Sequence, residues 1–336
     1  MNLEARINAF SLLGDHIRTL QTGEFNTLID AIAYQNPWFT TENVRMALQG
    51  ISKLLNKDGL TKWTSAYELH PSSGKTIGLA MAGNIPLVGF HDFLSVLIAG
   101  HRVRAKLSSV DSILLPHLAN KLISFEPEFG KRIHFEERLN NVDAVIATGS
   151  DNTARYFEYY FRNIPHIIRK NRSSCAILSG TEEAEQLTKL GKDIFSYFGL
   201  GCRNVSKLFL PEGYDLVNLF PAWENYSQVI HHHKYVNNYD YQKSILLVNK
   251  IPFYDNGFVL LKKEETFVSP ISVLFYEYYK NTEELKLKIN NHQEKIQCIV
   301  SSQKWFDGSE DFGEAQFPEL SDYADAVDTL AFLAKI

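Results

Sequence analysis

The chain has 336 residues, of which 45% are hydrophobic and 22% charged, and its formal net charge at pH 7 is -5. This composition is that of an ordinary globular protein, and the length favours two domains over one. The acidic balance argues against a nucleic-acid-binding protein, which would carry a concentrated basic face.

The cysteines and the N-terminus indicate the compartment. Cys175, Cys202 and Cys298 lie far apart and form no CxxC pair, so neither a disulfide framework nor a zinc knuckle is predicted. The first ten residues lack the apolar core of a secretory signal. The most apolar stretch, residues 76–100, is interrupted by Gly83-Asn84-Ile85-Pro86, whose broken backbone would be unsatisfied in lipid. We therefore expect a cytoplasmic protein without an integral membrane segment.

The first part of the chain predicts a helical segment followed by an α/β domain. Residues 1–60 carry apolar positions at helical spacing, and we expect two or three helices that either cover the next domain or contact a partner. Residues 61–180 then alternate between strand and helix patterns, which predicts a parallel sheet covered on both faces. The expected strands are 76–82, 101–105 and 143–147, and the expected helices 87–99, 111–123 and 151–161.

A second α/β domain is expected at residues 181–312, after a strand at 174–178. It begins with a long helix, 182–197, and continues with strands at 205–210, 258–261, 271–276 and 297–301. Residues 212–256 show no pattern that predicts an element. Residues 313–336 are expected to return to the first domain, with a helix over 321–336.

Cys202 is the first candidate for chemistry. Gly199 and Gly201 let the backbone turn sharply around it, and Arg203 adds positive potential that favours a thiolate. On these local features a catalytic thiolate and a structural cysteine remain equal alternatives.

Two further segments carry polar groups that ligands use. Gly149 and Ser150 follow an apolar strand and open a helix, which suits either a phosphate or an ordinary helix N-cap. The run His231-His232-His233 has side chains that diverge on a helix or a strand, so we expect a solvated loop and predict no metal site.

In chain order, these segments resemble the aldehyde-dehydrogenase superfamily, specifically its LuxC-type fatty-acyl-CoA reductases, from about residue 76 to the end. Gly83-Asn84-Ile85-Pro86 is similar to the family's loop whose asparagine donates to the oxyanion. Gly199-Leu200-Gly201-Cys202 resembles its nucleophile loop. The resemblance implies that Cys202 is the nucleophile and that Asn84 stabilises the oxyanion. It also implies two three-layer α/β domains with a cofactor and active-site cleft between them.

Three other segments resemble the family's cofactor-binding elements: VRAKLSS at 103–109, TGS at 148–150, and EETF at 264–267. They imply that Lys106 and Ser108 hold the adenosine ribose. They imply also that Gly149 and Ser150 approach the pyrophosphate, and that Glu265 binds the nicotinamide ribose.

The departures from the family pattern refine these expectations. Arg169 is the best match for the general-base glutamate of aldehyde-oxidising members, and loss of that base fits an enzyme that reduces thioesters rather than hydrolysing them. Val268 is an extra residue in the segment of Glu265. Ser109 replaces an acid that would repel a 2′-phosphate, which favours NADPH over NADH.

The resemblance thus implies an oxidoreductase that converts an acyl-CoA or acyl-carrier thioester to an aldehyde with NADPH, NADH being the second choice. A cysteine-dependent acyltransferase and a non-catalytic homologue are the alternatives. A homo-oligomer or an acyl-transfer partner protein is compatible with the sequence, which ends on a helix and not on the long strand that many relatives use to oligomerise.

Overall fold

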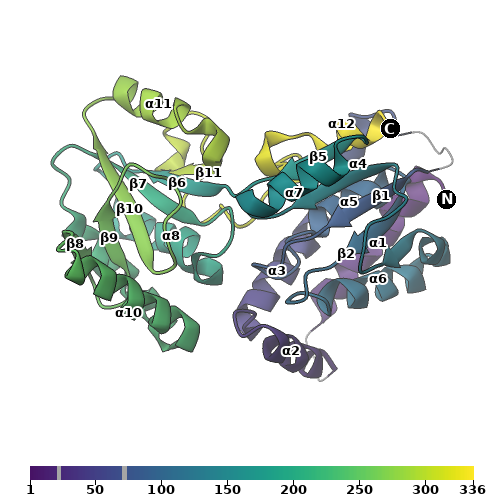
Figure 1. The fold of residues 1–336 in the computed structure, drawn as a ribbon, viewed down its shortest axis with the longest axis horizontal. Helices are drawn as coiled ribbons and strands as arrows, with labels where there is room; N and C mark the ends of the chain where they lie inside the picture. Colours follow the sequence, from purple (N-terminus) through teal and green to yellow (C-terminus); the bar gives the residue numbers. More distant parts are fainter. Residues whose placement is uncertain (21–23, 70–73) are drawn as a thin grey trace. The chain divides into compact units, whose positions relative to one another are not determined.

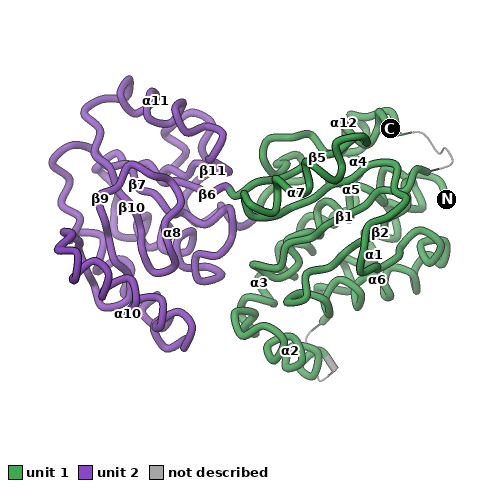
Figure 2. Tube along the Cα trace, viewed as in Figure 1, with its two compact units in different colours: residues 1–171, 318–336 green, residues 172–317 purple. Residues whose placement is uncertain are grey.

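The computed structural model describes residues 1–20, 24–69 and 74–336, and it consists of two compact units (Figures 1 and 2). Unit 1 contains residues 1–171 and 318–336, and unit 2 contains residues 172–317. Each unit has its own β-sheet. The C-terminal segment is thus part of the same unit as the N-terminus.

The sheet of unit 1 has five parallel strands in the order β3-β2-β1-β4-β5. The central strand β1 (Thr76–Ala80) lies between β2 (Arg102–Lys106) and β4 (Ala144–Thr148), and the edges are β3 (Ile133–Phe135) and β5 (His166–Arg169). The three inner strands confirm the sequence expectation. Both edge strands are too short, at three and four residues, to stand out as apolar runs.

Helices cover both faces of this sheet because alternate residues of its strands point to opposite sides. Leu79 and Ile146 pack toward α5 (Phe90–Ile98) and α6 (Leu114–Phe125) in the large core, whereas Ala80 and Ala147 pack toward Phe157 of α7. Helix α7 spans Asp151–Phe161, as expected from the sequence.

The N-terminal residues form four helices, more than the two or three expected: α1 (Leu3–Thr19), α2 (Glu24–Gln35), α3 (Thr41–Leu54) and α4 (Lys57–Ser65). They extend the core of unit 1 over α5 and α6. Arg6 of α1 is buried and donates from Nε to the carbonyl of Ile98 at 2.9 Å. Of the two roles considered for this segment, covering the first α/β domain is the one observed.

The sheet of unit 2 has six strands in the order β11-β6-β7-β10-β9-β8. All neighbours are parallel except the edge strand β8, which runs antiparallel to β9. The strands are β6 (Ser173–Ile177), β7 (Val205–Pro211), β8 (Phe253–Asp255), β9 (Leu260–Lys263), β10 (Val273–Tyr279) and β11 (Ile296–Ser301). The strands expected from the sequence are present with shifted ends.

Four helices complete unit 2: α8 (Ala184–Phe195), α9 (Leu219–Trp223), α10 (His233–Val248) and α11 (Thr282–Asn290). The featureless residues 212–256 contain α9, α10 and β8. The histidine run was wrongly expected to be a loop, since His231 ends a 3-10 helix and His233 begins α10. Shorter 3-10 helices are η1 (Pro127–Lys131), η2 (Ser196–Gly199), η3 (Leu216–Asn218), η4 (Glu224–His231), η5 (Gln293–Lys295), η6 (Ser302–Lys304) and η7 (Ala324–Ala326).

The C-terminal helix is shorter than expected. Only α12 (Thr329–Ala334) is α-helical, because Asp325 and Ala326 adopt left-handed φ angles of 59° and 55° that break the expected helix. Across the described residues, no helix is both long and apolar enough to cross a membrane.

Candidate functional site

The carboxyl edge of the unit 1 sheet is the place where its topology favours a ligand. The chain runs from β1 outward to β2 and β3, then returns to β4 on the other side of β1. In doubly wound sheets, ligands bind beyond the carboxyl ends of the strands at this switch point. Asn84, Lys106 and Gly149 follow β1, β2 and β4, so the fold brings these sequence-predicted residues to one edge.

The loop that carries Asn84 is held against the loop after β2. A Cβ atom at Gly83 would lie 2.6 Å from the Ser108 hydroxyl oxygen, so only glycine permits this approach. The backbone N–H of Leu87, which has a left-handed φ of 59°, donates to Asp111 Oδ2 at 2.9 Å. Burial raises the pKa of Asp111 to about 6, and the Leu87 hydrogen bond acts in the opposite direction. Asn84 itself is exposed on this fixed loop.

Lys106 ends β2, and its side chain is exposed at the same edge. Its carbonyl accepts the N–H of Met81 at 3.0 Å, which continues the β1–β2 ladder into the loop of Asn84. Ser108 is half-buried beside Gly83, and the next residue, Ser109, is exposed. This edge therefore offers a cation and two hydroxyl groups, with no acid at position 109.

Gly149 and Ser150 connect β4 to the N-terminus of α7. The Ser150 hydroxyl caps the helix by accepting the N–H of Thr153 at 3.3 Å. A Cβ atom at Gly149 would lie 2.9 Å from Thr153 Cβ, so packing against α7 requires a glycine there. The N-cap considered from the sequence is thus present, and the first turn of an eleven-residue helix points its positive end at this edge.

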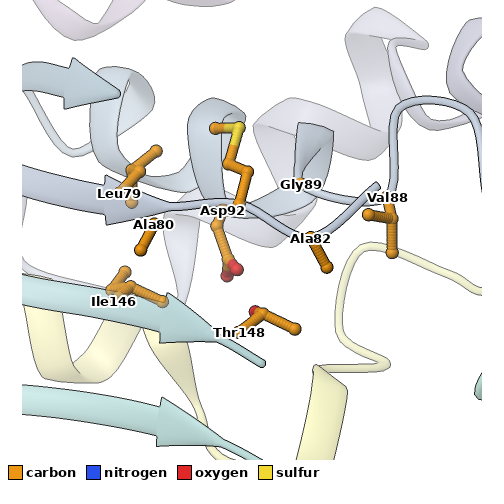
Figure 3. Close-up of a pocket in the computed structure, with 9 residues that line it drawn as sticks. Leu79, Ala80, Ala82, Val88, Gly89, Asp92, Ile146 and Thr148 are labelled. Atoms are coloured by element: carbon orange, nitrogen blue, oxygen red, sulfur yellow. The ribbon is translucent and has the colours of Figure 1, made fainter. Parts of the chain in front are cut away.

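A pocket of about 230 Å³ lies at the carboxyl ends of β1 and β4 (Figure 3). It is lined by Leu79, Ala80, Met81, Ala82, Val88, Gly89, Asp92, Ile146 and Thr148. The Asp92 carboxylate reaches from α5 toward Thr148.

Asp92 also forms an ion pair with Arg169, the residue that matched the family's general base. Arg169 ends β5, is buried, and places Nη2 2.7 Å from Asp92 Oδ1 and 2.8 Å from the Thr329 hydroxyl. It also donates to the carbonyl of Ala324. Arg169 therefore links β5, α5 and the C-terminal segment, and a guanidinium cannot act as a base at neutral pH.

Cys202 lies in unit 2, in the loop between η2 and β7, and it is half-buried. Tyr197, Phe198 and Gly199 adopt left-handed φ angles of 51°, 56° and 78° just before it. The carbonyl of Cys202 accepts the Ser174 hydroxyl at 3.0 Å. Cys175 and Cys298 are buried on strands, as expected for structural cysteines, so Cys202 is the most accessible thiol of the three.

Asn204 holds this loop, and we did not predict its role. Its Oδ1 accepts the N–H of Gly201 at 2.8 Å, and its Nδ2 donates to the carbonyls of Ser196 and Asp193 at 2.7 and 3.1 Å. Its carbonyl partners lie eight and eleven residues away, so only its position two residues after Cys202 could have drawn attention to it.

Asp193 connects the same loop to a second segment. Its buried carboxylate accepts the backbone N–H groups of Gly313 and Ala315 at 2.6 and 3.1 Å. Burial raises the pKa of Asp193 to about 7, against the effect of these two hydrogen bonds. The loop of Cys202 is thus fixed by buried polar groups and not by apolar packing alone.

Glu265 follows β9 in unit 2 and is exposed. The neighbouring Glu264 is already engaged, because its carboxylate forms an ion pair with Lys262 at 2.7 Å and accepts the N–H of Glu265 at 3.0 Å. Of the two glutamates, Glu265 is the one available to a ligand. Cys202 and Glu265 thus lie in one unit, and the other candidate residues lie in the other.

Metal ligation is not indicated by the described part of the chain, where no group of three or more His, Cys, Asp or Glu side chains is arranged to hold an ion. The imidazoles of His232 and His233 stack on each other, with ring centroids 5.1 Å apart.

The fold is that of the aldehyde dehydrogenases. The match to the Mycobacterium tuberculosis aldehyde dehydrogenase complexed with NAD+ has a TM-score of 0.64 and covers 90% of this chain and 73% of the other at 12% identity. A Cys-to-Ala mutant of aldehyde dehydrogenase C from Pseudomonas syringae, with NAD+ and octanal, gives 0.63, 94%, 74% and 12% for the same quantities.

A third solved structure, the NAD+ complex of a Bacillus cereus aldehyde dehydrogenase, has a TM-score of 0.61 and 15% identity, and it covers 90% of this chain and 72% of the other. No protein-family model matches the chain, and no curated protein matches it in sequence. At such identities the likeness shows the fold alone.

Proposed function

We propose that this protein reduces an acyl thioester to an aldehyde with NADPH, through an acyl-enzyme intermediate on Cys202. The observation that carries the proposal is the Cys202 loop, in which the most accessible thiol of the three stands beside Arg203 and is fixed by Asn204 in an aldehyde-dehydrogenase fold. An oxidoreductase that uses a nicotinamide nucleotide is the broader class, because the similar structures contain NAD+.

The residues at the carboxyl edge of unit 1 fit a nicotinamide nucleotide. Lys106 supplies an exposed cation for a phosphate, and Ser108 a hydroxyl for the ribose. The N-terminus of α7, at Ser150, suits the pyrophosphate. In unit 2, the Glu265 carboxylate can accept from ribose hydroxyls. The exposed Ser109, in place of an acid, leaves Lys106 free to bind a 2′-phosphate, which is why we propose NADPH over NADH.

In the proposed reaction the Cys202 thiolate attacks the thioester carbonyl. Two N–H donors, the Asn84 side-chain amide and the Cys202 backbone, stabilise the oxyanion, and such a donor is worth about 10²–10³ in rate. The carbon–sulfur bond to the carrier breaks, and the carrier leaves as a thiol. A bound nicotinamide supplies the hydride. The resulting thiohemiacetal on Cys202 then releases the aldehyde and regenerates the thiolate.

Arg169 supports reduction over hydrolysis. Hydrolysis of an acyl-enzyme needs a base that activates water. The residue that matches this base in the family is here a buried arginine paired with Asp92, and it cannot take a proton from water. An acyl-enzyme on Cys202 would therefore persist until a hydride reaches it.

The test is to mix the purified protein with a long-chain acyl-CoA and to follow acyl-adduct mass and NADPH absorbance together. We expect an adduct on Cys202 that disappears as NADPH is oxidised and aldehyde forms. The Cys202→Ala variant should lose both signals, whereas Cys298→Ala should keep them. An adduct without hydride transfer would instead establish an acyltransferase. Turnover by Cys202→Ala would disprove the proposal.

A further inference from the structure

The loop that carries Glu265 is held by two consecutive side chains of β7. This loop, residues 264–272, joins β9 to β10. The Ser206 hydroxyl donates to the carbonyl of Phe267 at 2.7 Å. The Lys207 ammonium donates to the carbonyl of Glu264, and that of Thr266 lies 3.4 Å away. Three of the loop's first four carbonyls are thus engaged by one strand.

A β-bulge explains how two consecutive side chains reach the same loop. In a regular strand, Ser206 and Lys207 would point to opposite faces. Here Ser174 of β6 pairs with Val205 and Cys175 pairs with Lys207, so Ser206 is the extra residue of a bulge. Bulges re-aim side chains in this way and are common next to functional sites.

Lys207 is fully buried, and its three N–H donors have three acceptors. The third is the carboxylate of Glu277 on β10, 2.5 Å away, which also pairs with Lys288 at 2.8 Å. Burial lowers the pKa of Lys207, and Glu277 opposes this effect. An apolar residue of similar size often stabilises a core as well as a buried ion pair does. The lysine therefore calls for a role beyond stability, and its contacts with the loop carbonyls supply one.

The same strands hold the nucleophile loop. β7 begins three residues after Cys202, and the Ser174 hydroxyl donates to the Cys202 carbonyl at 3.0 Å. The neighbouring Ser173 donates to the Ser206 hydroxyl at 2.6 Å. Through this short network, the segments of Cys202 and Glu265 are fixed to the same two strands.

We propose that Lys207 and Ser206 are positioning residues that hold the Glu265 loop in register with Cys202, and so set where the cofactor's ribose lies relative to the acyl-enzyme. The inference rests on the proposed function. It predicts that the two half-reactions separate: acylation of Cys202 does not need the loop, whereas hydride transfer does.

The experiment compares single-turnover acylation and hydride transfer in the wild type and in Lys207→Met, Lys207→Arg and Ser206→Ala. We expect Lys207→Met to acylate within about twofold of the wild type and to transfer hydride at least tenfold more slowly. Ser206→Ala should show a smaller loss of the same kind, and Lys207→Arg should recover part of the rate. The matched control is Lys288→Met, which removes the other partner of Glu277 without touching the loop, and its hydride transfer should stay normal.

Hydrogen exchange of residues 264–267 adds a readout that does not depend on activity. The inference predicts faster exchange there in Lys207→Met than in Lys288→Met. Equal losses of both half-reactions, equal effects of the two methionine variants, or unchanged exchange in the loop would overturn it. A wild-type protein that shows neither acylation nor NADPH oxidation would refute the proposed function, and the exchange comparison would still decide whether Lys207 holds the loop.

Discussion

Asn204 accepts the backbone N–H of Gly201 at 2.8 Å and so closes the loop around Cys202 from within. Its amide also donates to the end of α8 and to the turn that follows. The orientation of the thiol thus depends on a side chain that would play no chemical part in the reaction.

Replacement of Asn204 by alanine should therefore affect both stability and acylation. The variant leaves a buried N–H and several carbonyls without their partner, which costs about 1–3 kcal/mol in the free energy of unfolding. We expect acyl-adduct formation on Cys202 to slow at least tenfold, as measured by mass spectrometry against time. Asn249→Ala is the control, since Asn249 is exposed and donates only to the carbonyl of Ile245 in its own helix. An adduct rate unchanged in Asn204→Ala would refute this role.

The ion pair between Asp92 and Arg169 gives a second prediction. Arg169→Met leaves the Asp92 carboxylate in a largely buried place without its guanidinium, and we expect a loss of about 3–5 kcal/mol in urea-unfolding experiments. The double variant Asp92→Leu/Arg169→Met should regain much of that loss, because no charge is left unpaired. If the single and double variants proved equally unstable, the pair would not be the source of the effect.

The sequence predicts the α/β alternation well because inner parallel strands are buried on both faces and read as apolar runs, as in β1 and β4. It does not predict α10, whose Tyr, Asn and His residues keep its apolar positions from forming one stripe. Nor does it predict the roles of Asn204 and Lys207. Their partners are backbone carbonyls, which every residue possesses, so only the fold determines which of them come close.

The pKa of Asp111 makes stability depend on pH. Its pKa is raised from 3.8 to about 6 by burial, so the folded state binds a proton more tightly than the unfolded state. The resulting stabilisation is fully present below pH 3.8 and is lost as the pH rises through about 6, and it amounts to about 3 kcal/mol. Asp111→Asn keeps an oxygen that accepts the Leu87 N–H but cannot ionise. Urea unfolding should therefore show a weaker fall in stability between pH 4 and 6 in the variant. Identical slopes would contradict the raised pKa; Asp193, with a pKa of about 7, contributes equally to both proteins.

Lys106 gives a prediction about cofactor choice. An ammonium beside a 2′-phosphate strengthens binding through charge-assisted hydrogen bonds, and one such contact is worth roughly tenfold or more in affinity. Lys106→Ala should therefore weaken NADPH binding more than NADH binding, as measured by fluorescence titration at one fixed salt concentration. Arg102→Ala is the matched control, because Arg102 is an exposed cation at the opposite end of the same strand and should leave both affinities unchanged. Ser109→Asp should shift the preference further toward NADH, since a carboxylate there would repel the 2′-phosphate. Equal losses for the two nucleotides in Lys106→Ala would mean that this lysine binds a part they share, and the proposed preference for NADPH would then lose its structural basis.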